Sequence, residues 1–232
     1  MASNASKEER RVVIFDVGGV VADSPINAIR EFCRARQIED LNPFLFSSSA
    51  WHRLERDQLA WTDFPEAALA ECRERQFQPG VALGVEGWRD LQKVIKSGYA
   101  QLRPEMLEAI HRLRQAGFVV CALTNNFAEA KGSAAAEALA RFRSLFDHFI
   151  ESASSGMRKP EVAFYQHALQ TIGCRAEEAI FLDDIGKNLK PAAAMGIWTI
   201  HVENGRPKQY LEALQKLQAL VKIPLSSEPS KL

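Results

Sequence analysis

A short apolar run that ends in an aspartate constrains the fold of this chain more than any other feature. Residues 12–15 are valine, valine, isoleucine and phenylalanine, Asp16 follows them, and Gly18 and Gly19 come shortly after. A β-rich apolar run bounded by glycines indicates a fully buried strand, and open α/β sheets bind ligands at the carboxyl ends of such strands. The sequence therefore predicts a carboxylate at the tip of a buried strand, where it can act as a nucleophile or a ligand.

The second half of the chain alternates regularly between helix-like and strand-like segments. Pro104 and Pro160 each stand at the start of an amphipathic segment, and Gly117 and Gly173 stand where these segments end. Proline in the first turn and glycine after the last turn are typical of helix boundaries. Apolar runs follow, and we expect strands at residues 118–123, 179–182 and 197–202. Helices that alternate with short apolar strands indicate βαβ units and a parallel sheet.

Residues 26–99 differ from the rest of the chain, because they contain helix-like stretches but no convincing strand. We expect Trp51, Trp61 and Trp88 to pack in the core of this segment, since large aromatic side chains dominate protein cores. The prolines and glycines between residues 79 and 87 predict a break in its helices. The segment therefore indicates a helical insertion between the first strand and the alternating region.

Composition disfavours several classes of partner. Lysine plus arginine and aspartate plus glutamate both number 29, so the net charge is zero and nothing favours nucleic acid or an anionic membrane. No apolar run approaches the roughly 20 residues of a membrane span, and residues 1–11 lack the apolar segment of a secretory signal. We therefore expect an intracellular protein. The four cysteines are far apart without metal-type spacing, which predicts reduced and mostly buried thiols.

The chain ends in Ser230, Lys231 and Leu232, a tripeptide of the kind that the peroxisomal import receptor recognises. The residues before it are rich in proline and serine, and we expect them to stay exposed, as a receptor requires. The sequence therefore predicts the import receptor as a partner and the peroxisome as the location. If the tripeptide is a coincidence, the expected location is the cytoplasm.

Polar side chains of particular kinds follow the predicted strands or open the next helix. The residues are Asp16, Thr124, Asn125, Lys159, Asp183 and Asp184. Because the carboxyl ends of parallel strands meet at one edge of a sheet, we expect these side chains to converge. A carboxylate nucleophile beside a cation and a carboxylate pair suits phosphoryl transfer through a covalent aspartyl phosphate. Carboxylates without histidine or cysteine favour Mg²⁺ as the metal.

Four runs of sequence carry a resemblance to a known family. They are FDVGGV at residues 15–20, LTN at 123–125, GMRKP at 156–160 and FLDDIGKN at 181–188. They resemble the four ordered motifs of the haloacid dehalogenase-like hydrolase superfamily. Within it, residues 146–202 most resemble the N-terminal phosphatase domain of soluble epoxide hydrolases and the related N-terminal domain of an acyl-CoA dehydrogenase family member.

The resemblance implies an α/β fold class, with a Rossmann-like parallel-sheet core and an inserted α-helical cap. We expect the core at residues 1–21 and 100–220, the cap at 22–99 and a flexible tail with the import signal at 221–232. The position of the cap agrees with the helical insertion that follows the first strand.

The resemblance also implies a role for each residue of the constellation. Asp16 is expected to be the nucleophile, Lys159 and Thr124 to bind the transferring phosphoryl group, and Asn125 to contact substrate or phosphate. The expected Mg²⁺ ligands are Asp16, the backbone carbonyl of Gly18, Asp184, and Asp183 either directly or through water.

The chain departs from the family pattern at Gly18, where most of the family's phosphatases carry an aspartate that protonates the leaving group. Loss of a positioned acid and base costs roughly two to four orders of magnitude in rate. Asp23 is either a substitute acid or an ordinary helix cap. Lys187 and Lys190 either form a solvated face or attract an anionic substrate, and the sequence leaves both interpretations open.

These patterns predict a Mg²⁺-dependent phosphatase that acts on a small phosphomonoester. The likeness to the epoxide hydrolase domain implies a lipid or isoprenoid phosphate, whereas relatives with glycine at position 18 imply a sugar phosphate. The alternative is a non-catalytic module that binds a phosphorylated ligand or a partner after the loss of its acid. A metal-free haloacid dehalogenase is a third hypothesis, which the pair Asp183 and Asp184 disfavours because extra anions do not help attack on a halocarboxylate.

Overall fold

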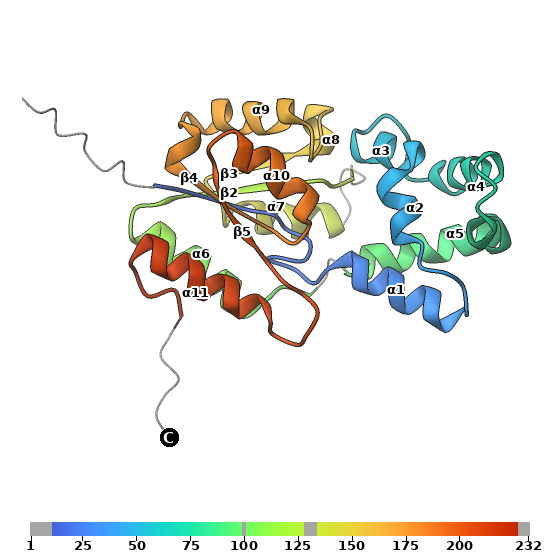
Figure 1. The fold of residues 1–232 in the computed structure, drawn as a ribbon, viewed down its shortest axis with the longest axis horizontal. Helices are drawn as coiled ribbons and strands as arrows, with labels where there is room; N and C mark the ends of the chain where they lie inside the picture. Colours follow the sequence, from blue (N-terminus) through green and yellow to red (C-terminus); the bar gives the residue numbers. More distant parts are fainter. Residues whose placement is uncertain (1–10, 99–100, 128–133, 227–232) are drawn as a thin grey trace, which may run out of the picture.

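The computed structural model describes residues 11–98, 101–127 and 134–226 and contains a five-stranded parallel sheet (Figure 1). Its strands are β1 (Val12–Phe15), β2 (Val119–Thr124), β3 (His148–Glu151), β4 (Ala179–Asp183) and β5 (Trp198–His201). They lie in the order β3-β2-β1-β4-β5, and every neighbouring pair is parallel. The predicted α/β fold with a parallel sheet is confirmed.

Helices cover both faces of the sheet. The core helices are α6 (Pro104–Gln115), α7 (Ala134–Arg143), α8 (Ser152–Ser155), α9 (Val162–Ile172), the 3₁₀ turn η1 (Ala176–Glu178), α10 (Gly186–Ala194) and α11 (Tyr210–Val221). Helices α6 and α11 pack on one face and α9 and α10 on the other (Figure 1). Val13 and Phe15 of β1 point into the first layer, and Val12 and Ile14 point into the second. Burial on both faces explains why β1 is apolar at every position.

The helical insertion forms a unit with its own core beside the sheet (Figure 1). It consists of α1 (Pro25–Ala35), α2 (Asn42–Ser47), α3 (Ser49–Glu55), α4 (Phe64–Glu74) and α5 (Gln78–Gly98). Trp88 is fully buried in this core, as are Leu91 and Ile95. Phe127, in the segment after β2, packs on Trp51 and Trp61 with ring centroids 5.1 and 4.8 Å away, so the sheet side of the molecule also contributes to the cap core.

The helix break expected from the prolines and glycines at 79–87 is confirmed at Gly84, whose φ of 59° is non-helical and divides α5 (Gln78–Gly98) into two helical segments. Pro79 is tolerated because the first turn of a helix needs no backbone donor. Strand β3 was not predicted. Ordered packing continues beyond residue 221, since Leu225 is buried and its N–H donates to Gln218 Oε1 over 2.9 Å.

Three further expectations concern the C-terminal tripeptide, membrane spans and the cysteines. The import tripeptide, Ser230 to Leu232, lies outside the described residues. No helix in residues 11–98, 101–127 or 134–226 is long and apolar enough to cross a membrane. All four cysteines are free thiols and three of them are buried, as their spacing predicted.

Replacement of Trp88 tests whether the cap core contributes to the stability of the chain. Trp88 packs against Phe44 and Phe64 and donates its Nε1–H to the Gly80 carbonyl over 3.0 Å. Trp88→Ala is expected to lower the free energy of unfolding in urea by about 3–5 kcal/mol, because it leaves a cavity and an unpaired carbonyl. Trp198→Ala is the matched control, since Trp198 is 47% exposed, and it should cost clearly less. Equal losses in the two variants would contradict the assigned burial.

Candidate active site

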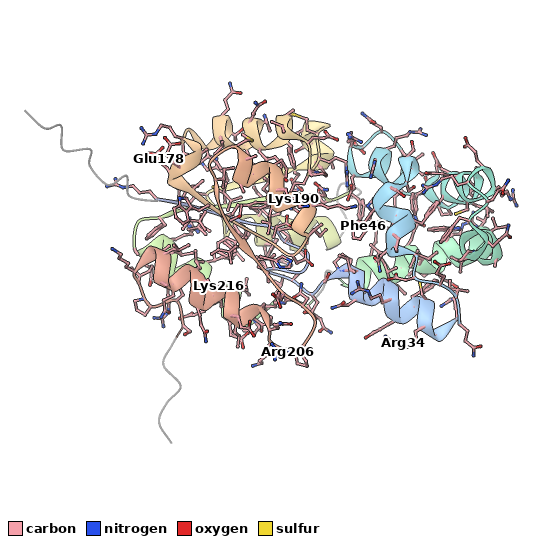
Figure 2. The ribbon with its side chains drawn as sticks, viewed as in Figure 1. Arg34, Phe46, Glu178, Lys190, Arg206 and Lys216 are labelled. Atoms are coloured by element: carbon pink, nitrogen blue, oxygen red, sulfur yellow. The ribbon has the colours of Figure 1, made fainter. Side chains whose placement is uncertain are left out.

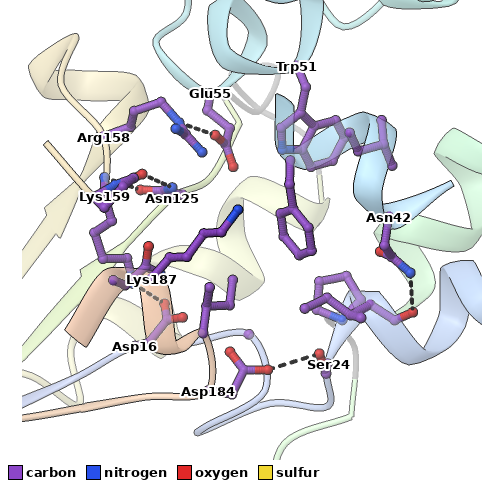
Figure 3. Close-up of a pocket in the computed structure, with 18 of the residues that line it drawn as sticks. Asp16, Ser24, Asn42, Trp51, Glu55, Asn125, Arg158, Lys159, Asp184 and Lys187 are labelled. Carbon is purple, nitrogen blue, oxygen red and sulfur yellow. Dashed lines mark hydrogen bonds and ion pairs between the residues drawn. The ribbon is translucent and has the colours of Figure 1, made fainter. Parts of the chain in front are cut away.

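A cavity of about 330 Å³ lies between the cap and the carboxyl edge of the sheet (Figure 3). Its core side is polar and includes Asp16, Asn125, Arg158, Lys159, Asp184 and Lys187. Its cap side is mostly apolar and includes Ile26, Ile29, Leu45, Phe46 and Trp51. Phe46, which is 39% exposed, sits on the side of the cap that faces the core (Figure 2). The cavity therefore joins a charged floor to an apolar wall.

Lys159 is a buried cation between two carboxylates. Its Nζ lies 2.8 Å from Asp16 Oδ1 and 2.7 Å from Asp183 Oδ2, and only 1% of the residue is exposed. Burial opposes the charged amine, but the two carboxylates outweigh this effect and raise the pKa of Lys159. Asp16 Oδ1 also accepts the backbone N–H of Val17 over 2.7 Å. One oxygen of Asp16 is thus fixed by two donors, and neither contact involves Oδ2.

Asp183 holds Lys159 in place. Its Oδ1 accepts the N–H of Ile185 over 2.7 Å, and the Nδ2 of Asn188 lies 3.1 and 3.0 Å from its two oxygens. Together with Lys159 these donors surround a carboxylate that has no exposed surface. The structure therefore gives Asp183 a direct contact to the lysine, in addition to the position near the metal site that we expected.

Asp184 has one hydrogen-bonded oxygen and one without a partner. Oδ2 accepts from Ser24 Oγ and from Asn204 Nδ2, each over 3.1 Å. Oδ1 is buried and has no hydrogen-bond partner among the described residues. A buried acceptor without a donor costs free energy, and a bound ion or water at this point would satisfy it.

The acidic cluster fits a hard divalent cation. Ligand oxygens of Asp16, Asp183 and Asp184 lie within 4.8 Å of one another. Burial raises the pKa of Asp16 to about 7 and the pKa of Asp184 to about 8, and neighbouring carboxylates add to both shifts. A cation at this point would offset the repulsion and satisfy Asp184 Oδ1, and carboxylate oxygens are ligands that Mg²⁺ prefers.

Thr124, the last residue of β2, and Asn125, the residue after it, have different surroundings. Asn125 lines the cavity, donates Nδ2–H to the Lys159 carbonyl over 3.1 Å and accepts the Lys159 N–H at Oδ1 over 2.9 Å. Its amide therefore holds the backbone of Lys159. Thr124 is 3% exposed and does not line the cavity, and its Oγ1 lies 3.4 Å from the Asn125 carbonyl.

The position of the missing acid is open to the cavity, and the proposed substitute is elsewhere. Gly18 lines the cavity. The Asp23 carboxylate lies 3.4 Å from Arg103 Nε, and Asp23 does not line the cavity, so the structure does not support it as a substitute acid. Lys187, in the first turn of α10, extends into the cavity, whereas Lys190 does not line it (Figure 3).

Ion pairs tie the cap to the segment that contains Lys159. Glu55 in α3 pairs with Arg158, and both side chains are buried beside the cavity (Figure 3). The next cap residue, Arg56, pairs with Glu161, which lies three residues after Arg158. Sequence reasoning missed these cap residues and also Ser24, Arg103 and Asn204, because no spacing pattern connects them to the motifs.

A capped parallel α/β sheet with this charged edge defines a class of hydrolase. Residues 10–196 match the model of the haloacid dehalogenase-like hydrolases, and the chain belongs to this family. The resemblance that the four motifs carry is therefore confirmed.

Curated relatives agree with this assignment. The chain is 42% identical over 214 residues to bifunctional epoxide hydrolase 2 of Mus musculus, an alignment that covers 84% of this chain and 36% of the relative. It is 32% identical over 220 residues to acyl-CoA dehydrogenase family member 10 of Mus musculus, with 93% and 19% covered. The chain thus spans a minor part of both relatives. It is 27% identical over 200 residues to sesquiterpene phosphatase astK of Aspergillus oryzae, with 83% and 89% covered.

Solved structures share the fold. A HAD-like hydrolase from Porphyromonas gingivalis superposes with a TM-score of 0.62 at 20% identity, covering 89% of this chain and 97% of that one. A HAD family enzyme from Bacteroides thetaiotaomicron, in complex with magnesium and inorganic phosphate, has a TM-score of 0.56 at 17% identity, with 87% and 98% covered. At these identities the similarity shows the fold.

Replacement of Gly19 tests the close packing of the β1 loop on Asp184. Gly19 has φ of 81°, and a Cβ there would lie 2.0 Å from Asp184 Oδ2. Gly117 is the matched control, because its φ is 84° and nothing lies within 4 Å of its virtual Cβ. Gly117→Ala should cost about 1–2 kcal/mol of unfolding free energy for the left-handed backbone alone. Gly19→Ala should cost about 1–3 kcal/mol more through the collision. Equal losses in urea unfolding would show that the loop yields freely.

Proposed function

We propose that the protein is a Mg²⁺-dependent phosphatase that hydrolyses a small phosphomonoester through a phosphorylated Asp16. The observation that carries this proposal is the buried Lys159 ammonium between Asp16 and Asp183, next to an Asp184 oxygen without a partner. A fixed cation beside a carboxylate nucleophile stabilises a transferring phosphoryl group, because it neutralises negative charge in a site of low dielectric.

In the proposed reaction, Asp16 forms a bond to phosphorus while the bond from phosphorus to the leaving oxygen breaks. The leaving oxygen takes a proton from water, since Gly18 offers none. A second water then hydrolyses the aspartyl phosphate, which restores the Asp16 carboxylate and releases inorganic phosphate. Asp16, the Gly18 carbonyl and Asp184 would hold Mg²⁺, which neutralises phosphate charge when bound. Lys159 binds a phosphoryl oxygen while Asp183 keeps its amine in position.

The apolar wall supports a lipid or isoprenoid monophosphate over a sugar phosphate. A cavity of about 330 Å³ has room for a small ligand, and Ile26, Ile29, Leu45, Phe46 and Trp51 provide few donors for sugar hydroxyls. The polar cap residues of the lining, Asn42, His52 and Glu55, already contact the Ile26 carbonyl, the Phe46 carbonyl and Arg158. The name of one relative, a sesquiterpene phosphatase, fits an apolar substrate. Lys187 adds a cation to the polar end of the cavity, where it would attract the phosphate.

Gly18 favours a second candidate function, a module that binds a phosphorylated ligand without turnover. The charged floor would still bind phosphate and a cation, but no side chain at position 18 would protonate the leaving group. Ligand binding and phosphate hydrolysis must therefore be measured separately to distinguish the two functions.

Asp16→Asn tests the nucleophile. The amide keeps the size of the side chain but cannot attack phosphorus, so hydrolysis of an aryl phosphate should fall about a thousandfold or more. Turnover by the parent should require Mg²⁺ and disappear with a chelator. Asp57→Asn is the control, because Asp57 is an exposed carboxylate outside the cavity, and its turnover should equal that of the parent.

Each outcome of this experiment has a consequence. Metal-dependent turnover that survives in Asp16→Asn would contradict the covalent route. A parent without turnover that still binds Mg²⁺ and a phosphate analogue by calorimetry would favour the non-catalytic module.

Phe46→Ala tests the apolar wall. Removal of the ring should raise KM for an isoprenoid monophosphate about tenfold, or about 1.4 kcal/mol, because apolar contact area is lost. KM for a sugar phosphate should change less than twofold. Val162→Ala, at a 47% exposed position in α9 outside the cavity, should leave both values unchanged. A KM that rises equally for both substrates would argue against an apolar ligand on this wall.

A further inference from the structure

The contacts of Asp184 distinguish its two oxygens. Ser24 Oγ and Asn204 Nδ2 both donate to Oδ2, each over 3.1 Å, and Figure 3 shows the contact with Ser24. Oδ1 is buried without a partner among the described residues. Two donors on one oxygen restrict rotation of the carboxylate, so the partnerless oxygen is held in a fixed direction.

Arg103 fixes the orientation of the Asn204 amide. Its Nη2 donates to Asn204 Oδ1 over 3.0 Å, which leaves the Nδ2 end of the amide to face Asp184. A reversed amide would place two donors together at Arg103 and two acceptors together at Asp184. Arg103 is itself 7% exposed and stacks on the Tyr210 ring at 4.3 Å, so it is a rigid support.

The same residues also hold the loop after β1. Asn204 Nδ2 donates to the Gly19 carbonyl over 2.9 Å, and Arg103 Nη1 donates to it over 2.8 Å. Gly18, whose carbonyl we propose as a metal ligand, is the residue before. The network thus joins three distant parts of the chain, at residues 18–24, 103 and 204, around the end of β4.

We propose that Ser24 and Asn204, the latter oriented by Arg103, are positioning residues that aim Asp184 Oδ1 at the divalent cation. The proposal rests on the proposed function, because it requires a cation at the cluster of Asp16, Asp183 and Asp184. Ser24, Asn204 and Arg103 all lie outside the four sequence motifs. Residues that orient a ligand carboxylate typically change metal affinity 10–100-fold when they are removed.

Binding of Mg²⁺ alone, measured by calorimetry on the full chain, tests the proposal. Asn204→Ala should raise the dissociation constant of Mg²⁺ about 10–100-fold, and Ser24→Ala should raise it about tenfold. Asn27→Ala is the matched control, because Asn27 borders the same surface depression as Ser24 and Asn204 but its Oδ1 accepts from Arg30 over 3.3 Å. Its dissociation constant should stay within twofold of the parent value.

A second measurement separates positioning from a structural role. Thermal unfolding in the presence of a chelator should change little in Ser24→Ala, and hydrolysis of an aryl phosphate should approach the parent kcat once Mg²⁺ is saturating. A loss of kcat that saturating Mg²⁺ does not restore would contradict a role through the metal.

The outcomes distinguish this proposal from the proposed function. Parent-like Mg²⁺ affinity in both Asn204→Ala and Ser24→Ala would overturn the positioning role while leaving the phosphatase intact. A parent that binds no Mg²⁺ would refute the metal-dependent function and this proposal with it. If Asn204→Ala fails to fold, Ser24→Ala alone decides, since it leaves Arg103 and its contact to Asn204 unchanged.

Discussion

The site depends on one ammonium group held between two carboxylates. Lys159 contacts Asp16 and Asp183 at 2.8 and 2.7 Å in a place almost without solvent. Isolated buried charges are costly, and a buried pair is tolerated only when its hydrogen bonds are complete. Asp183 meets this condition through Asn188 and Ile185. With Asp184 included, three carboxylates share one ammonium, so the cluster has an excess of negative charge that a divalent cation would balance.

Sheet topology makes this cluster possible. Strands β1 and β4 are neighbours with Phe15 opposite Leu182, so the residues that follow, Asp16 and Asp183, emerge side by side. Neighbouring strands are about 4.8 Å apart, a distance that one ammonium can bridge. Lys159 reaches them from the segment that follows α8, and Asn125 at the end of β2 holds its backbone. The ends of strands β1, β4 and β2 therefore together set the position of the Lys159 ammonium.

The sequence contained most of this information, but only where local physics demands particular residues. Burial on both faces requires an apolar β1, which made that strand predictable. Strand β3 is a four-residue edge strand with two half-buried positions, so its pattern is weak. The charged residues of the motifs could be named, whereas Ser24, Arg103 and Asn204 could not. Their contacts arise from three loops that only the folded chain brings together, and no periodicity records such contacts.

In the proposed reaction, the glycine at position 18 gives the cap a larger part in the chemistry. Without an acid at that position, the rate depends more steeply on how readily the leaving oxygen departs, because no positioned proton assists it. The core still fixes Asp16 and the Lys159 ammonium, because the contacts between Lys159, Asp16 and Asp183 do not involve residue 18. In the proposed phosphatase, discrimination between substrates would rest on the apolar wall of the cap and on the ion pair of Glu55 with Arg158, which joins cap to core beside Lys159. Burial of the charges on the floor strengthens their interactions with a bound phosphate, which compensates in part for the missing acid in the proposed reaction.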